Sequence, residues 1–251
     1  MNEEKFTGKA STYSKYRPTY PKAYIDYLYS EVGLKEDSII ADIGSGTGIF
    51  SRLLLSRGST VLGIEPNDDM RRFAEKDLAG FKGYTSIKAS AENTALPDFS
   101  VDFITVAQAF HWFDRSSFRL ECKRILKYSG RVILVWNSRD SFSDMIIQND
   151  NINKRYCPEF KGFSGGNGGG SPEQYADFFK DGHCDCQTFT YDLVLDEQGF
   201  IGRNLSSSYA PKENTQGYHA YVEELSRLFS QYADHGSLRF PNMTRSYVGE
   251  V

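Results

Sequence analysis

The sequence predicts an α/β protein built on a doubly wound, mostly parallel sheet. Strand-like and helix-like segments alternate over the first 140 residues, and the strand-like segments are nearly continuous in valine, isoleucine and leucine. Such runs are typical of parallel strands that helices cover on both faces. A glycine-rich turn, "GSGTG", directly follows the first of these segments.

Each element of the first half has its own local signal. Strands are expected where short apolar runs end in turn residues, at 39–43, 60–66, 84–90, 101–110 and 131–138. Helices are expected where apolar residues recur every three or four positions, at 49–57, 67–80 and 114–126. Asn67 or Asp68 is expected to cap the second of these helices, and Asp114 the third. A helix before them is expected to begin near Pro18 or Pro21.

The second half is less regular. Helices are expected at 145–156 and 217–233, and strands at 186–195 and 237–251, the last one broken near Pro241. Two late strands with no long crossover between them predict an antiparallel addition at the sheet edge. The glycine-rich stretch 164–171 is expected to be a loop, either an insertion over a site or an exposed connector.

Composition and charge exclude several classes of protein. The chain of 251 residues has a net charge of −4 and no long basic block, so we expect no nucleic-acid partner. No apolar run approaches the roughly 20 residues that span a bilayer, and the polar N-terminus lacks a signal-peptide core, so we expect a cytoplasmic protein without a membrane partner. The four cysteines are scattered, and "HCDC" offers too few ligands, so no metal site is expected.

The glycine turn and a later acid indicate a nucleoside-bearing ligand. Gly44, Gly46 and Gly48 let the backbone approach a ligand closely, but Ile49 stands where the dinucleotide fingerprint needs its third glycine. Glu65 ends the second strand, about 17 residues later, where a carboxylate can accept both hydroxyls of a ribose.

Five segments resemble the motifs of the class I S-adenosylmethionine-dependent methyltransferases. They are "ADIGSGTGIF", "GIEPNDDM", "ASAENTALP", "VDFITVAQAFHWFD" and "RILKYSGRVILV". The resemblance covers residues 39–138 and implies a Rossmann-like sheet of seven strands with an antiparallel C-terminal strand. Tyr128 and Ser129 depart from it, because they replace the usual Pro-Gly of the turn before the fifth strand. "YSKYRPTYP", "AFHWF" and "SSSYAP" extend the resemblance to small-molecule methyltransferases described as trans-aconitate methyltransferase-like.

The resemblance implies S-adenosylmethionine as cofactor and a set of residues that bind it. From the methionine end to the adenine these are Asp42, Gly44, Ser45, Gly46, Gln108, Glu65, Pro66, Met70, Ala91 and Glu92. Glu65 would bind the ribose, Pro66 and Met70 would flank the adenine, and Gln108 would lie beside the sulfonium. Two alternatives stay open: Met70 as part of the helix core and Asp42 as a brace of the glycine turn.

The acceptor side is expected at the same edge of the sheet. The candidates for binding an acceptor are Tyr16, Arg17, Trp112, Trp136, Arg139 and Tyr209. Arg17 could clamp a carboxylate of cofactor or substrate through a bidentate pair, or be a solvated surface arginine. His111 is the candidate catalytic base, with a pocket wall and simple packing as alternatives. A carboxylate acceptor would need no base, whereas a hydroxyl or an acidic carbon would.

The sequence therefore predicts one methyltransferase domain over residues 1–251, acting on a small molecule, with an organic acid among the candidates. Residues 1–35 are expected to form a helical lid, 36–140 the cofactor-binding core and 141–251 the substrate-side helices and final strands. The alternatives are an NAD(P)-dependent oxidoreductase, which the missing third glycine disfavours, and a non-catalytic S-adenosylmethionine-binding module. Both a monomer and a homodimer remain open.

Overall fold

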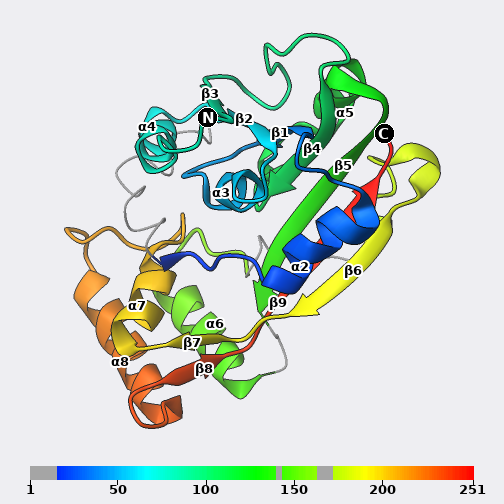
Figure 1. The fold of residues 1–251 in the computed structure, drawn as a ribbon. Coiled ribbons are helices and arrows are strands. Elements are labelled where there is room, and N and C mark those ends of the chain that lie inside the picture. The colour runs from blue at the N-terminus through cyan, green and yellow to red at the C-terminus, as the bar shows by residue number, and fades with distance from the viewer. Residues whose placement is uncertain (1–15, 140–142, 163–171) are drawn as a thin grey trace.

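The computed structural model describes residues 16–139, 143–162 and 172–251, so the glycine-rich stretch 164–171 lies outside the described residues. A seven-stranded sheet with the order β3-β2-β1-β4-β5-β9-β6 forms the centre of the molecule (Figure 1). Its strands are β1 (Ile39–Ile43), β2 (Thr60–Ile64), β3 (Tyr84–Ile87), β4 (Val101–Ala107), β5 (Leu126–Arg139), β6 (Asp185–Thr190) and β9 (Asn242–Gly249). The first five strands pair in parallel, and β9 pairs antiparallel with both β5 and β6. The predicted fold class is therefore confirmed.

Helices cover both faces of this sheet. The helices are α2 (Lys22–Tyr27), α3 (Ile49–Leu55), α4 (Asp68–Asp77), α5 (Arg115–Ile125), α6 (Asp144–Tyr156), α7 (Glu197–Leu205) and α8 (Tyr218–Tyr232). Buried residues of α2, α3 and α4 form one core with the sheet, and those of α5 form the core on the opposite face. This arrangement explains why the strands read as continuous apolar runs.

A lobe of three helices and a small sheet packs beside the main sheet. It contains α6, α7, α8 and a two-stranded sheet of β7 (Leu193–Leu195) and β8 (Leu238–Phe240), around a third hydrophobic core. The N-terminal segment that leads into α2 runs between this lobe and the main sheet (Figure 1). Among the described residues, no helix is long and apolar enough to cross a membrane.

The N-caps of α4 and α5 are residues that the sequence predicted for this role. The side chain of Asn67 accepts hydrogen bonds from the amides of Asp69 and Met70, which makes it the N-cap of α4. Asp114 caps α5 by accepting from the amide of Ser117 at 2.8 Å. Both caps satisfy amides that have no partner within the helix.

Two of the expected strands differ in the structure, and one expected break is present. The strand expected at 101–110 ends at Ala107, because Gln108 has a φ of 63° and leads into a 3₁₀ turn, Phe110–Trp112. The strand expected at 186–195 is split between β6 of the main sheet and β7 of the small one. The break predicted near Pro241 is confirmed: β8 ends before it and β9 begins after it, since proline cannot donate a ladder hydrogen bond.

Candidate active site

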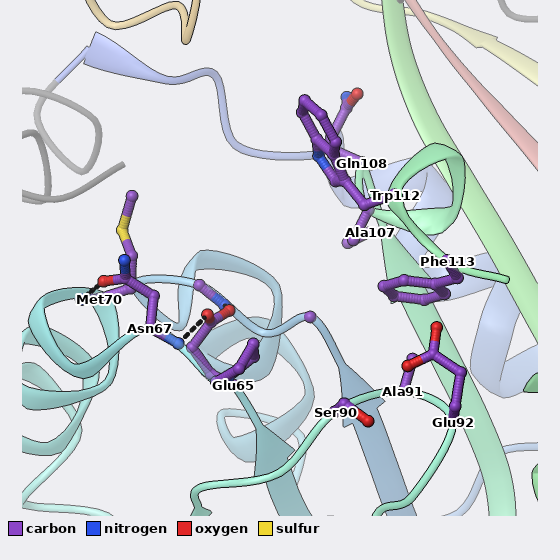
Figure 2. A pocket seen from close by; sticks show the side chains of 14 residues that line it. Glu65, Asn67, Met70, Ser90, Ala91, Glu92, Ala107, Gln108, Trp112 and Phe113 are labelled. Atoms are coloured by element: carbon purple, nitrogen blue, oxygen red, sulfur yellow. Dashed lines mark hydrogen bonds between the residues drawn. The ribbon is translucent and has the colours of Figure 1, made fainter. Parts of the chain in front are cut away.

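A cavity of about 230 Å³ opens where the carboxyl ends of β1, β2 and β4 meet (Figure 2). Its lining comes from the glycine turn after β1, the turn after β2, the loop after β3 and the segment after β4. The residues are Gly44, Gly46, Glu65, Pro66, Asn67, Met70, Ser90, Ala91, Glu92, Ala107, Gln108, Ala109, Trp112 and Phe113. This cavity, called the first cavity below, brings together most of the residues that the sequence assigned to a cofactor.

The glycine turn shapes one wall of the first cavity. Gly44 has a φ of 68°, and a Cβ there would lie 2.6 Å from the Cβ of Ala109. Gly46 has a φ of 56°, and a Cβ there would meet no atom within 4 Å, because this position faces open space. Any larger residue at Gly44 would therefore push the 3₁₀ turn away, and the bare backbone at Gly46 leaves room for a ligand.

Glu65 is held at the centre of the cavity by two backbone amides. One carboxylate oxygen accepts from the amide of Gly46 at 2.9 Å and the other accepts from the amide of Asn67 at 2.8 Å. The side chain is only 8% exposed, so these bonds offset much of the cost of burying its charge. A carboxylate can accept up to about four hydrogen bonds, so this group is of the kind that binds ligand hydroxyls.

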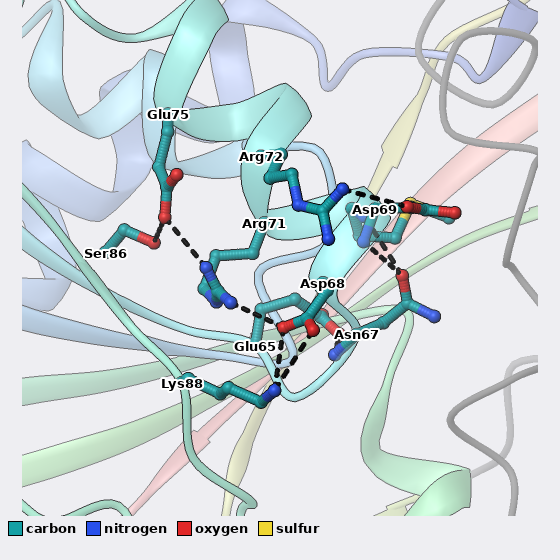
Figure 3. Close-up of polar contacts among 10 residues, drawn as sticks. Glu65, Asn67, Asp68, Asp69, Arg71, Arg72, Glu75, Ser86 and Lys88 are labelled. Carbon is teal, nitrogen blue, oxygen red and sulfur yellow. Dashed lines mark hydrogen bonds and ion pairs between the residues drawn. The ribbon is translucent and has the colours of Figure 1, made fainter.

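Charged side chains of α4, together with Lys88 just after β3, hold the start of α4 next to Glu65 (Figure 3). Asp68 pairs with Arg71 at 2.5 Å and with Lys88 at 2.9 Å, and Glu75 accepts from Arg71 at 3.0 Å. Lys88 follows β3, so these pairs join the helix to the neighbouring edge strand. Asp68, Glu75 and Lys88 are at least 41% exposed, so each pair contributes little energy individually, but together they restrain the turn that carries Glu65.

Met70 is both a core residue and a residue of the cavity wall, the two possibilities that the sequence left open. It is 3% exposed and therefore belongs to the core, yet its side chain also lines the first cavity (Figure 2). Glu92 lines the cavity from the loop after β3, and its carboxylate accepts from the amide of Asp114 at 3.0 Å. That bond joins the loop to the N-cap of α5.

A second, smaller cavity of about 60 Å³ adjoins the first. It shares Gly44, Gly46, Ala107 and Gln108 with the first cavity, so the two meet at the glycine turn and the end of β4. Its other lining residues are Arg17, Pro18, Tyr20, Ser45, Thr47, Ile49, Phe50, Asn137, Arg139 and Arg203. The described residues that line it include three arginines and no aspartate or glutamate.

Burial and neighbouring positive charges lower the pKa values of two of these arginines, Arg203 and Arg139. Desolvation lowers the pKa of Arg203 well below its ordinary value, and the charges of Arg139 and Arg17 lower it further. Desolvation also lowers the pKa of Arg139, against a smaller opposing effect of Tyr209. The guanidinium carbons of Arg139 and Arg203 lie 5.7 and 4.8 Å from the centre of the same ring, that of Phe240. An anion in the second cavity would relieve this concentration of positive charge.

His111 lies on the 3₁₀ turn after β4, outside the lining of both cavities. Its side chain is exposed, and its ring lies 4.6 Å from that of Trp112. The surrounding protein and, to a smaller degree, the charge of Arg17 lower the pKa of His111 to about 4. The imidazole is therefore neutral at pH 7 and a weak base.

Asp42 is a brace of the glycine turn. It is fully buried below the turn and accepts from the hydroxyls of Ser51, at 2.5 Å, and Thr105, at 2.8 Å. It lines neither cavity. The direct cofactor contact expected for Asp42 therefore does not fit its position, because its carboxylate is buried between α3 and β4, where Ser51 and Thr105 bind it.

The expected acceptor residues separate into three groups. Arg17 and Arg139 line the second cavity, whereas Trp112 lines the first. Tyr16 packs on Gly202 of α7, and Tyr209 packs against Phe160 with ring centres 4.7 Å apart.

Trp136 does not fit the expectation that it faces the acceptor. It is buried in the core on the α5 face of the sheet, stacked on Tyr175 at 5.0 Å. Because side chains alternate along a strand, its neighbour Val135 packs into the core on the opposite face.

Asn137 and Arg203 also line the second cavity. Asn137 donates to the carbonyl of Thr19 at 3.1 Å and accepts from the hydroxyl of Thr244 at 2.6 Å, while its own carbonyl accepts from the side chain of Gln108 at 3.3 Å. The sequence indicates a role for Asn137 only through its position near the carboxyl end of a strand, one residue after Trp136. The segment "GRNLSSSYAP" offers Arg203, Ser207 and Tyr209 as plausible pocket residues, but no local pattern distinguishes Arg203 from a surface arginine.

Residues 41–134 match the family model described as a methyltransferase domain. The matched residues run from β1 into β5. An uncharacterized methyltransferase-like protein of Schizosaccharomyces pombe is 27% identical over 98% of this chain and 94% of its own length. An uncharacterized methyltransferase of Mycobacterium tuberculosis is 34% identical, over 54% of this chain and about half (53%) of its own length.

The fold also resembles solved structures. A protein of Anaeromyxobacter dehalogenans named as a type II methyltransferase superposes with a TM-score of 0.70, covering 93% of this chain and 97% of that one. Its sequence identity is 21%, so this likeness concerns the fold alone.

Proposed function

We propose that this protein is an S-adenosylmethionine-dependent methyltransferase whose acceptor is a small organic acid. The observation that carries the proposal is the pair of adjoining cavities. One contains a buried carboxylate at the end of β2, and the other contains three arginines and no acid among its described lining. The methyltransferase domain match over residues 41–134 supports the reaction class.

The residues of the first cavity fit a nucleoside-bearing cofactor. The open space at Gly46 and the carboxylate of Glu65 suit a ribose, and Met70 with Pro66 offers an apolar wall to a base. When bound, S-adenosylmethionine supplies a methyl group already activated by its sulfonium. Gln108 lines both cavities, so its side chain stands at the passage between cofactor and acceptor.

The chain's own contribution is alignment and charge. Arg17, Arg139 and Arg203 can hold a carboxylate through bidentate hydrogen bonds and so orient the acceptor toward the shared edge of the two cavities. A carboxylate reaches this site without a proton to lose, and therefore needs no base. This agrees with a neutral, weakly basic His111 that lines neither cavity.

Two measurements test the proposal. Calorimetry with S-adenosylmethionine should give a single site per chain, and a radioactive methyl-transfer assay over four- to six-carbon acids should find an acceptor. The amide analogue of each accepted acid serves as its control and should react at least about a hundredfold more slowly, because the guanidinium pairs are lost. Absence of cofactor binding, or equal transfer to acid and amide, would contradict the proposal.

A further inference from the structure

A buried carboxylate on α5 holds the loop that follows β3. Glu121 is 7% exposed, and one of its oxygens accepts from the amide of Thr94 at 2.8 Å and from the hydroxyl of Thr94 at 2.5 Å. Thr94 is itself fully buried, and it lies two residues after Glu92, which lines the first cavity. Glu121 therefore fixes the loop just behind the part that forms the cavity wall.

Arg124, one turn further along α5, holds the next part of the same loop. Its guanidinium donates to the two oxygens of Glu121 at 2.9 and 2.7 Å and to the carbonyl of Leu96 at 2.7 Å. It also donates to the carboxylate of Asp98 at 2.6 Å. Burial raises the pKa of the Glu121 carboxyl, but the hydrogen bonds from Arg124 and Thr94 outweigh it, so this pKa lies below its ordinary value. Glu121 is therefore charged at neutral pH, and its hydrogen bonds are of the stronger, charge-assisted kind.

The backbone between these two anchors is strained. Ala95 has a φ of 60°, a left-handed conformation that is unfavourable for a residue with a Cβ. Its neighbours on either side, Thr94 and Leu96, are the residues that Glu121 and Arg124 bind. Strain of this kind persists only where the surrounding structure imposes the conformation. The shape of the loop therefore depends on α5 rather than on the local preferences of its own residues.

A third contact joins the loop to the other end of α5. The carboxylate of Glu92 accepts from the amide of Asp114, the N-cap of the helix, at 3.0 Å. The loop contributes three residues to the lining of the first cavity, Ser90, Ala91 and Glu92. Glu121 lines neither cavity, so it can act on a ligand only through this loop.

We infer that Glu121 is a positioning residue for the nucleoside end of the cofactor, because it holds the loop that forms one wall of the first cavity. Its loss should weaken cofactor binding and leave the rate of methyl transfer at saturating cofactor unchanged, because its side chain is remote from the reacting atoms. This inference rests on the proposed function, since it concerns the cofactor of the same site.

The test compares S-adenosylhomocysteine with 5′-methylthioadenosine, each titrated calorimetrically into the full chain. The two ligands share the nucleoside and its sulfur, and only the first carries an amino-acid part. Glu121→Ala should weaken both at least about fivefold, and by the same factor within about twofold, because the effect is confined to the nucleoside end. Thermal unfolding measures the stability of the variant separately, and the titrations are run well below its Tm.

Three further variants separate positioning from general damage. Lys123→Ala is the matched control, because Lys123 is exposed and lies two residues away on the same helix, and it should keep both affinities within about twofold. Glu121→Gln keeps one oxygen that can accept from Thr94 and should retain both affinities within about threefold. Thr94→Val removes only the hydroxyl and supplies the test if Glu121→Ala does not fold. It should weaken both ligands about two- to threefold.

The outcomes distinguish this inference from the proposed function. If the wild type binds neither ligand, the proposed function fails. If the wild type binds both and a folded Glu121→Ala variant keeps both affinities, only the inference on Glu121 is wrong. If Glu121→Ala weakens S-adenosylhomocysteine and leaves 5′-methylthioadenosine unchanged, the effect lies at the amino-acid end and the positioning role is overturned. Equal losses in Glu121→Ala and Glu121→Gln would also overturn it, because the bond to Thr94 would then not be the cause.

Discussion

Replacing Glu65 with alanine tests the assignment of the first cavity most directly. The carboxylate accepts from the amides of Gly46 and Asn67 at 2.9 and 2.8 Å and lines the first cavity. A hydrogen bond to a charged group is worth about 1.5 to 3 kcal/mol, so losing the ribose hydroxyls should weaken cofactor affinity about tenfold to a hundredfold.

The same substitution should also cost stability. It leaves two amides without their acceptor, and water in the cavity replaces part of what is lost, so we expect about 2 kcal/mol at the lower end of the range for unsatisfied groups. In a chain of this size that corresponds to a decrease in Tm of roughly 4 to 8 °C. Thermal unfolding measures this loss separately from binding.

Calorimetry with S-adenosylmethionine, run well below the Tm of the variant, measures the affinity. Glu75→Ala is the matched control, because Glu75 lies on α4 and contacts Arg71 and Ser86 away from the cavity (Figure 3). It should leave the affinity within about twofold of the wild type. A folded Glu65→Ala variant with wild-type affinity would refute the ribose assignment.

Two further predictions concern groups next to the cavities. His111→Ala should keep cofactor affinity and reduce turnover by less than about tenfold, and a loss above about a hundredfold would instead identify a base. Burial raises the pKa of Asp42 from 3.8 to about 6, so the folded state binds this proton more tightly than the unfolded chain does. The stabilisation is fully present below pH 3.8 and is lost as the pH rises through 6, a change of about 3 kcal/mol. Asp42→Asn should remove this dependence in urea denaturation at pH 4 and pH 7, whereas an unchanged difference between the two pH values would contradict the shift.

The order of strands and helices over residues 39–138 was predictable from local patterns. Apolar runs, the glycine turn and the caps Asn67 and Asp114 act within a few residues, where sequence spacing and backbone geometry are directly linked. The place of Glu65 followed from the same rule, since strand ends in a parallel sheet meet at one edge.

The second cavity was not predictable in this way, because residues far apart in the chain form it. Arg17 and Ser206 are 189 positions apart, and Asn137 and Thr19 are 118 apart. Helix α7 went unpredicted, so nothing in the sequence indicated that Gly202 would meet Tyr16.

Trp136 and Asn137 show which properties of a site follow from the sequence and which depend on the tertiary structure. Strand alternation requires that the two point to opposite faces, and this much follows from the sequence alone. Which face carries the acceptor cavity depends on where the N-terminal segment and α7 pack. Tertiary packing placed three arginines on the side of Asn137 and left Trp136 in the core, because a local pattern contains no information about which distant surfaces bury each other.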